Sequence, residues 1–144
     1  MRHGDDVKLL LVEDNDIDVK IFERAMRKAG IDRPTRIACD GKDALDILRG
    51  AGAVERLEKP NVVVLDLNMP RMDGLQFLAE VRADPYLHNL VVFVLTTSDA
   101  PSDRQRAYEH NIAGYLLKSL VREDFLASVR LIGNYIDRVR LPLH

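Results

Sequence analysis

Five polar residues in this chain each follow a short apolar run, and their types point to phosphoryl-transfer chemistry. Buried segments seldom end in a charge or a hydroxyl without a reason, so these positions are candidates for one site. They are Glu13, Asp14, Asp66, Thr96 and Lys118. Three carboxylates brought together repel one another unless a cation lies among them. Oxygen ligands with open positions suit Mg²⁺, which keeps several waters and accepts phosphoryl oxygens.

Asp66 is the residue that we expect to react. It follows the apolar, mostly β-branched run 62–65, which is typical of a strand buried on both faces of a parallel sheet. Open α/β sheets place their sites at the carboxyl ends of such strands. A carboxylate there can attack phosphorus and form an acyl phosphate. Mg²⁺, the Lys118 ammonium and the Thr96 hydroxyl would then neutralise or bind the phosphoryl oxygens.

Strand and helix patterns alternate along the chain and predict the scaffold that positions these residues. The expected strands are 8–12, 35–39, 62–65, 91–95 and 115–117, each followed by a helical pattern, and the last helix is expected over 122–140. Five such repeats predict a doubly wound, flavodoxin-like α/β fold with helices on both faces of a five-stranded parallel sheet. The pattern alone leaves the strand order open. We choose 2-1-3-4-5 because it brings the candidate residues together.

Composition excludes several other classes of protein. A length of 144 residues fits one domain, and a net charge of -2 gives no reason to expect nucleic acid or an anionic membrane as a partner. No apolar run approaches membrane-spanning length, so we expect a cytoplasmic protein. Cys39, the only cysteine, is predicted to be a buried structural thiol.

Each candidate residue also has an ordinary structural explanation. Asp14 could cap the first helix, Thr96 could bond a neighbouring backbone group, and Lys118 could be a surface residue. The coincidence of all five candidates at strand ends favours a shared site over these separate explanations.

The chain resembles the receiver domain of two-component response regulators, the CheY-like family, over nearly its whole length. The matching motifs are Glu13-Asp14, the run Asp66-Leu67-Asn68-Met69-Pro70 with Asp73-Gly74, then Thr96, and Gly114-Tyr115 before Lys118. The spacing of Asp66, Thr96 and Lys118 also fits receivers. The resemblance implies a signalling phosphoacceptor and not a metabolic enzyme, one that catalyses only its own phosphorylation and dephosphorylation.

The resemblance also implies a role for each matching residue. Asp66 would take a phosphoryl group from the phosphohistidine of a sensor histidine kinase. The implied Mg²⁺ ligands, which could also hold Mn²⁺, are Asp14, Asp66 and the backbone carbonyl of Asn68, with Glu13 holding a metal-bound water. Thr96 and Lys118 would follow the phosphoryl group, Thr96 and Tyr115 would form the switch, and Asn68 and Ser98 would tune dephosphorylation. The switch would alter the face made by the fourth helix, fifth strand and fifth helix.

One position departs from the family pattern. Receivers usually have Lys-Pro after the fifth strand, commonly with a cis bond, whereas this chain has Lys118-Ser119. A cis bond before a residue other than proline costs roughly 3 kcal/mol, so the resemblance leaves this bond open as cis or trans. The Lys-Ser pair, the Thr96-Thr97-Ser98 run and the absence of an output domain are most similar to the single-domain regulators that serve phytochrome-type kinases.

The C-terminal segment, about 122–144, predicts a further contact. We expect residues 1–144 to form a single receiver domain in which this segment mediates homodimerisation. Phe125, Val129, Ile132 and Ile136 lie on one stripe of the last helix, and the tail after it is apolar. A long apolar arc beyond the last strand has little sheet left to cover. The alternative is that the tail folds back on its own domain.

Two other functions remain as alternatives. An aspartate-nucleophile phosphohydrolase also uses an aspartate at a strand end with Mg²⁺. Such enzymes need a second acid two residues on, where this chain has Asn68, and a cap segment for which there is no room. A degenerate receiver that serves only as a binding module is disfavoured by the intact Asp14, Asp66, Thr96 and Lys118.

Overall fold

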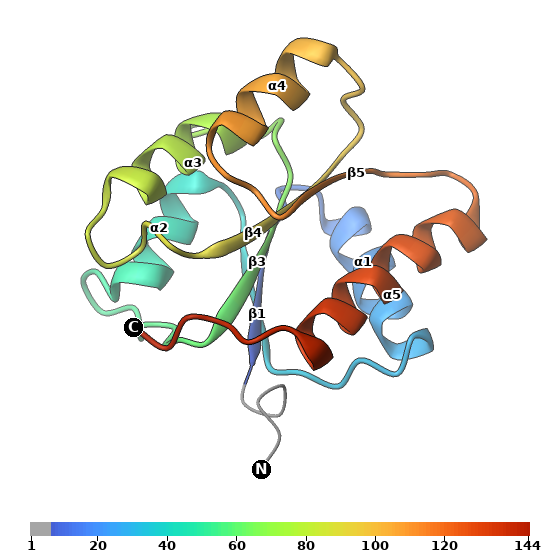
Figure 1. The fold of residues 1–144 in the computed structure, drawn as a ribbon, viewed down its shortest axis with the longest axis horizontal. Helices are drawn as coiled ribbons and strands as arrows, with labels where there is room; N and C mark the ends of the chain where they lie inside the picture. Colours follow the sequence, from blue (N-terminus) through green and yellow to red (C-terminus); the bar gives the residue numbers. More distant parts are fainter. Residues whose placement is uncertain (1–6) are drawn as a thin grey trace.

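Five parallel strands alternate with five helices in the computed structural model, which describes residues 7–144 (Figure 1). The first six residues of the predicted domain lie outside this range. The strands are β1 (Lys8–Val12), β2 (Thr35–Ala38), β3 (Asn61–Leu65), β4 (Val91–Thr96) and β5 (Gly114–Leu117). The helices are α1 (Asp16–Lys28), α2 (Gly41–Arg49), α3 (Gly74–Ala83), α4 (Pro101–Glu109) and α5 (Arg122–Arg138). The strand order is β2-β1-β3-β4-β5, so the predicted doubly wound fold is confirmed.

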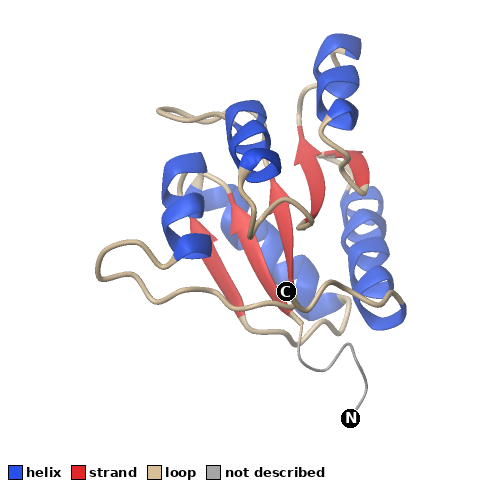
Figure 2. Ribbon diagram, turned by 60° about the vertical axis from the view of Figure 1, so that its left-hand side comes forward, coloured by secondary structure: helices blue, strands red, loops and turns tan. Residues whose placement is uncertain are grey.

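The sheet lies between two layers of helices, with α1 and α5 on one face and α2, α3 and α4 on the other (Figures 1 and 2). Side chains alternate between the faces along each strand. In β3, Val62 and Val64 join the core under α1 and α5, whereas Val63 and Leu65 join the core under α2 and α3. Because both faces are covered, β3 is apolar at every position from 62 to 65.

Three of the helices begin with a side-chain cap, whereas α4 and α5 do not. Asn15 caps α1, Asp40 caps α2, and Asp73 forms a capping box with Gln76 at the start of α3. The first turn of α4 contains Pro101, has no side-chain cap, and only Ala107 of this helix is buried. The helix α4 is therefore held to the sheet by less apolar packing than its neighbours.

The tail after α5 folds back on its own domain. Leu141 is 6% exposed and belongs to the same core as α1 and α5. Asn89 Nδ2 donates a hydrogen bond to the main-chain oxygen of His144 at 3.2 Å. Figure 1 shows the tail crossing the sheet from the end of α5 towards the side of α2. Much of the apolar surface of the tail is thus covered within the domain.

The prediction of a buried thiol at Cys39 is wrong, because this residue is exposed. It follows Ala38, the last residue of the edge strand β2, and Ala38 takes the inward position. Alternation then directs Cys39 outward, where Arg71 Nη2 lies 3.7 Å from its sulfur. No helix in the described range is long and apolar enough to cross a membrane.

Candidate functional site

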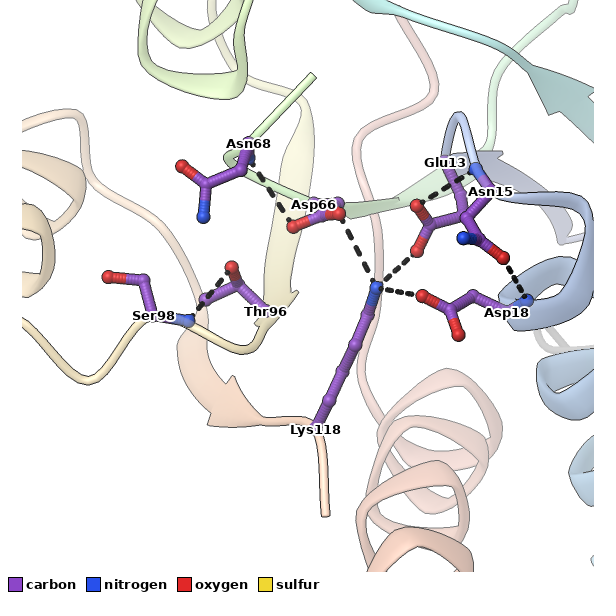
Figure 3. Close-up of polar contacts among 8 residues, drawn as sticks. All are labelled: Glu13, Asn15, Asp18, Asp66, Asn68, Thr96, Ser98 and Lys118. Atoms are coloured by element: carbon purple, nitrogen blue, oxygen red, sulfur yellow. Dashed lines mark hydrogen bonds and ion pairs between the residues drawn. The ribbon is translucent and has the colours of Figure 1, made fainter. Parts of the chain in front are cut away.

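Strand register brings the predicted residues to one edge of the sheet. Val12 pairs with Leu65, so the residues that follow them, Glu13 and Asp66, leave the sheet side by side. The Asp66 amide donates a hydrogen bond to the carbonyl of Val12 at 3.0 Å. On the far side, Thr96 ends β4 and its carbonyl accepts a 2.8 Å bond from the amide of Lys118. Figure 3 shows Thr96 and Lys118 on different sides of Asp66.

A cluster of three carboxylates forms the centre of the site. Oxygens of Glu13, Asp14 and Asp66 lie within 4.8 Å of one another. Glu13 and Asp66 are buried, at 5% and 8% exposure, whereas Asp14 is exposed. Two buried ligands and one exposed ligand leave coordination positions open to water and phosphoryl oxygens, which is the arrangement that Mg²⁺ prefers. The donor set therefore fits the predicted divalent cation.

Lys118 reaches into this cluster from the end of β5. Its Nζ contacts Glu13 Oε1 closely and lies 3.0 Å from Asp18 Oδ2 and 3.4 Å from Asp66 Oδ2 (Figure 3). Burial alone would lower the pKa of the Lys118 ammonium, but the hydrogen bond to Glu13, the charge of Asp66 and the bond to Asp18 together raise it. The ammonium therefore stays charged and offsets part of the repulsion among the carboxylates.

Unlike the Lys118 ammonium, the charged form of Glu13 is disfavoured, because this carboxylate is buried beside another carboxylate. Burial raises its pKa to about 7, and the charge of Asp66 adds to this shift, whereas the hydrogen bond from Lys118 lowers the pKa. The amide of Asn15 also donates to Glu13 Oε2 at 3.3 Å. In the absence of a cation, Glu13 is thus poised to hold a proton near neutral pH.

The loop after Asp66 requires a glycine. A Cβ on Gly74 would lie 2.6 Å from the carbonyl oxygen of Asp66 and 2.7 Å from the Cα of Leu67. The start of α3 can therefore pack against the backbone of Asp66 only if position 74 has no side chain. The amide of Asn68 returns to the site and donates to Asp66 Oδ1 at 3.4 Å.

A chain of hydrogen bonds leads from Thr96 to Tyr115. The buried Thr96 hydroxyl accepts from the amide of Ser98 at 3.3 Å, and the Ser98 carbonyl accepts from the Tyr115 hydroxyl at 2.8 Å. The Ser98 hydroxyl donates to Asp103 of α4 at 2.6 Å, and Figure 3 shows it directed away from Asp66. The predicted switch residues are therefore connected through the loop between β4 and α4.

One feature that the sequence left open takes a definite form here, and one residue was missed. The Lys118–Ser119 bond is trans, and the single cis bond in residues 7–144 precedes Pro60. Asp18, which contacts Lys118, was not among the predicted residues. It lies in the first turn of α1, four residues after Asp14, and this closeness in sequence could have indicated that it faces the same edge of the sheet.

A hollow joins the site to the side of α1 and α5. A cavity of about 380 Å³ is lined by Asp66 and Lys118 at one end and by Ile21, Leu120 and Phe125 at the other. A second groove of about 330 Å³ between α1 and α5 shares the last three residues. The site thus opens towards a largely apolar surface.

Fold and site together define a receiver domain, and the chain belongs to the response regulator receiver domain family, whose model matches residues 9–130. It is 36% identical over 135 residues to the response regulator Rcp1 of Synechocystis, covering 93% of this chain and 92% of Rcp1. It is 37% identical over 130 residues to a probable methanogenesis regulatory protein, FilR2, of Methanothrix harundinacea, covering 88% of this chain and 81% of FilR2.

Solved structures give the same assignment. The Mn²⁺-bound form of Rcp1 superposes with a TM-score of 0.84 at 36% identity, covering 95% of this chain and 99% of that structure. The phosphorylated cyanobacterial phytochrome response regulator RcpA superposes with a TM-score of 0.85 at 31% identity, covering 94% and 97%. The protein is therefore a response regulator similar to those of phytochrome signalling.

Proposed function

We propose that Asp66 accepts a phosphoryl group from the phosphohistidine of a sensor histidine kinase in the presence of Mg²⁺. The observation that carries this proposal is the position of Asp66, buried among carboxylates with the Lys118 ammonium 3.4 Å from its Oδ2. An Asp66 oxygen attacks phosphorus as the P–N bond of the donor breaks, and the electron pair of that bond leaves with the imidazole. Lys118 neutralises charge on the transferred oxygens.

The cation would be held by Asp14, Asp66 and the backbone carbonyl of Asn68, with Glu13 bonding one of its waters. When bound, Mg²⁺ or Mn²⁺ supplies positive charge to the phosphoryl oxygens. The carboxylate cluster of Glu13, Asp14 and Asp66 supports this assignment, and the relative Rcp1 has a Mn²⁺-bound form. The same site would catalyse loss of the phosphoryl group to water, at a rate tuned by Asn68 and Ser98.

The surface beside the site supports a protein as phosphodonor. Ile21 on α1 is exposed, and Leu120 and Val121 in the loop between β5 and α5 are exposed as well. A small phosphodonor makes no use of such an apolar surface, whereas a kinase domain can cover it. Similarity to Rcp1 and RcpA favours a phytochrome-type kinase, and a cytoplasmic location would follow from that partner.

The output would be a shift of population in α4, β5 and α5. A phosphoryl group on Asp66 would attract the Thr96 hydroxyl and so break its bond with the Ser98 amide. Displacement of Ser98 would release the Tyr115 hydroxyl on β5 and Asp103 on α4. The weak packing of α4 makes this helix the element that responds most readily.

We also propose a homodimer, in which only the exposed part of the segment 122–144 forms the contact. Ile136 and Leu141 are buried within the domain, so they are not available to a partner. Leu131 and Leu143 remain 47% and 60% exposed and would form the contact. Light scattering of the wild type and of Leu131→Glu tests this: a dimer mass reduced by the substitution supports it, and a monomer mass in the wild type overturns it.

Incubation with Mg²⁺ and acetyl phosphate tests phosphorylation. We expect the intact mass to increase by one phosphoryl group, and hydroxylamine to remove it. Asp66→Asn should abolish the increase, whereas Asp16→Asn, a neutralisation of an exposed aspartate on α1, should not. An unmodified wild type would indicate a degenerate binding module, and multiple turnover of unrelated phosphoesters would indicate a phosphohydrolase.

A further inference from the structure

Lys118 has an anchor that the phosphoacceptor chemistry itself does not require. Its Nζ lies 3.0 Å from Asp18 Oδ2, nearer than the 3.4 Å to Asp66 Oδ2. Asp18 is not one of the clustered carboxylates of the described residues that could hold a metal ion, which are Glu13, Asp14 and Asp66. Its contact with the site is therefore made through the ammonium of Lys118.

The backbone of Asp18 is fixed in place. Its amide donates to Oδ1 of Asn15, the N-cap of α1, at 3.0 Å, so the first turn of the helix is closed around it. From this position its side chain reaches a lysine 100 residues further along the chain. The anchor is thus provided by a helix that is packed into the core through Phe22 and Met26.

The side chain of Lys118 is less firmly fixed than its backbone. The Lys118 amide donates to the Thr96 carbonyl at 2.8 Å, but the residue stands just after the end of β5, and Leu120, two residues further on, is fully exposed. The flexible four-carbon stem of a lysine does not by itself hold an ammonium in one place. Side-chain partners must therefore direct Nζ towards Asp66.

We propose that Asp18 is a positioning residue that, together with Glu13, holds the Lys118 ammonium against Asp66. An ammonium has three N–H donors, and the three carboxylates here accept one each. When a phosphoryl group occupies Asp66, one donor turns to a phosphoryl oxygen while Glu13 and Asp18 keep the other two. This assignment rests on the proposed phosphorylation of Asp66 and adds to it the residue that aims its cation.

Asp18→Ala and Asp16→Ala are a matched pair for the test. Each substitution removes a carboxylate from the first turn of α1, so each loses a similar favourable interaction with the helix dipole. Only Asp18 forms an ion pair with Lys118, whose other partners are Glu13 and Asp66. We expect Asp18→Ala to slow phosphorylation by acetyl phosphate at saturating Mg²⁺ roughly fivefold relative to Asp16→Ala. The affinity for Mg²⁺ should be the same in both variants.

The background Lys118→Ala separates positioning from a general structural effect. If Asp18 acts through Lys118, then Asp18→Ala causes no further slowing in that background. Equal rates for Asp18→Ala and Asp16→Ala overturn the proposal, as does slowing of the same size with and without Lys118.

A second measurement does not depend on phosphorylation. NMR relaxation of the Lys118 Cε methylene, without cation or phosphodonor, should give a lower order parameter in Asp18→Ala than in Asp16→Ala. Equal order parameters overturn the positioning role even if phosphorylation occurs. If the wild type accepts no phosphoryl group but the order parameter falls, the proposed function fails while the anchor remains.

Discussion

Glu13 should make cation binding depend on pH near neutrality. Burial raises its pKa to about 7, from a value of 4.5 for an unperturbed carboxyl. At pH 6 the carboxyl therefore holds its proton in roughly ten molecules for each ionised one, and at pH 8 this ratio is reversed. Glu13 is expected to accept a bond from a metal-bound water, and a nearby cation favours the ionised form of this carboxyl, so Mg²⁺ binding should displace the proton. The apparent Kd for Mg²⁺ should be about tenfold weaker at pH 6 than at pH 8.

The same proton predicts an opposite trend in stability. A pKa raised by folding means that the folded state binds the proton more tightly than the unfolded chain. The resulting stabilisation is fully present below a pH of about 4.5 and is lost as pH rises through about 7. Without a cation, the Tm should therefore fall between pH 6 and pH 8. Saturating Mg²⁺ should reduce this fall, because the cation takes the place of the proton.

Calorimetric titration with Mg²⁺ measures both the affinity and the proton release. The chain has no tryptophan, so heat is a better signal than intrinsic fluorescence. Repeating the titration near pH 7 in buffers of different ionisation enthalpy should show release of about half a proton per cation. In Glu13→Gln, the affinity should be nearly constant between pH 6 and pH 8. A wild-type affinity that is independent of pH, or a tenfold change that persists in Glu13→Gln, would refute this reasoning.

Three further predictions concern the scaffold. Arg82 donates hydrogen bonds to four backbone carbonyls, two in the loop between α3 and β4 and two directly after α4. Arg82→Leu should therefore lower the free energy of unfolding in urea by about 2 kcal/mol, and the exposed Arg106→Leu should lower it much less. Equal losses in the two variants would contradict this. Gly74→Ala should lower the free energy of unfolding by about 1–3 kcal/mol and slow phosphorylation, because the new Cβ would meet backbone atoms. Gly114→Ala should have a milder effect, because its Cβ would lie 3.4 Å from a phenylalanine ring. The reverse ranking would exclude close backbone packing as the cause. Tyr115→Phe should cost about 1 kcal/mol by loss of its hydroxyl bond, and an unchanged unfolding midpoint would show that water replaces this bond.

The parts of the fold that follow from local pattern were predictable from the sequence. The apolar runs identified each strand, and the convergence of Asp66, Thr96 and Lys118 supplied the strand order that periodicity could not. Asp18 was missed because its contact spans 100 residues and its own surroundings resemble an ordinary polar helix start. The prediction for Cys39 was wrong because the sequence did not show which way the residues at the end of β2 face: Ala38 points inward, and Cys39 after it points outward. The path of the tail depends on packing that only the folded chain displays.

The Lys118 ammonium and the Thr96 hydroxyl, which both lie beside Asp66, are held by elements of different stability. Lys118 is tied through Asp18 and Glu13 to α1 and β1, which are packed into the core. The Thr96 hydroxyl, by contrast, accepts from the Ser98 amide, and the Ser98 hydroxyl is bonded in turn to Asp103 of α4, a helix with one buried residue and no side-chain cap. A phosphoryl group on Asp66 would attract both Lys118 and the Thr96 hydroxyl. The partners of Lys118 on α1 and β1 should then move little, whereas the loop and α4 beside Thr96 can move more easily. We therefore expect the conformational response to occur in α4 and β5, and the face formed by α1 to stay unchanged for the phosphodonor.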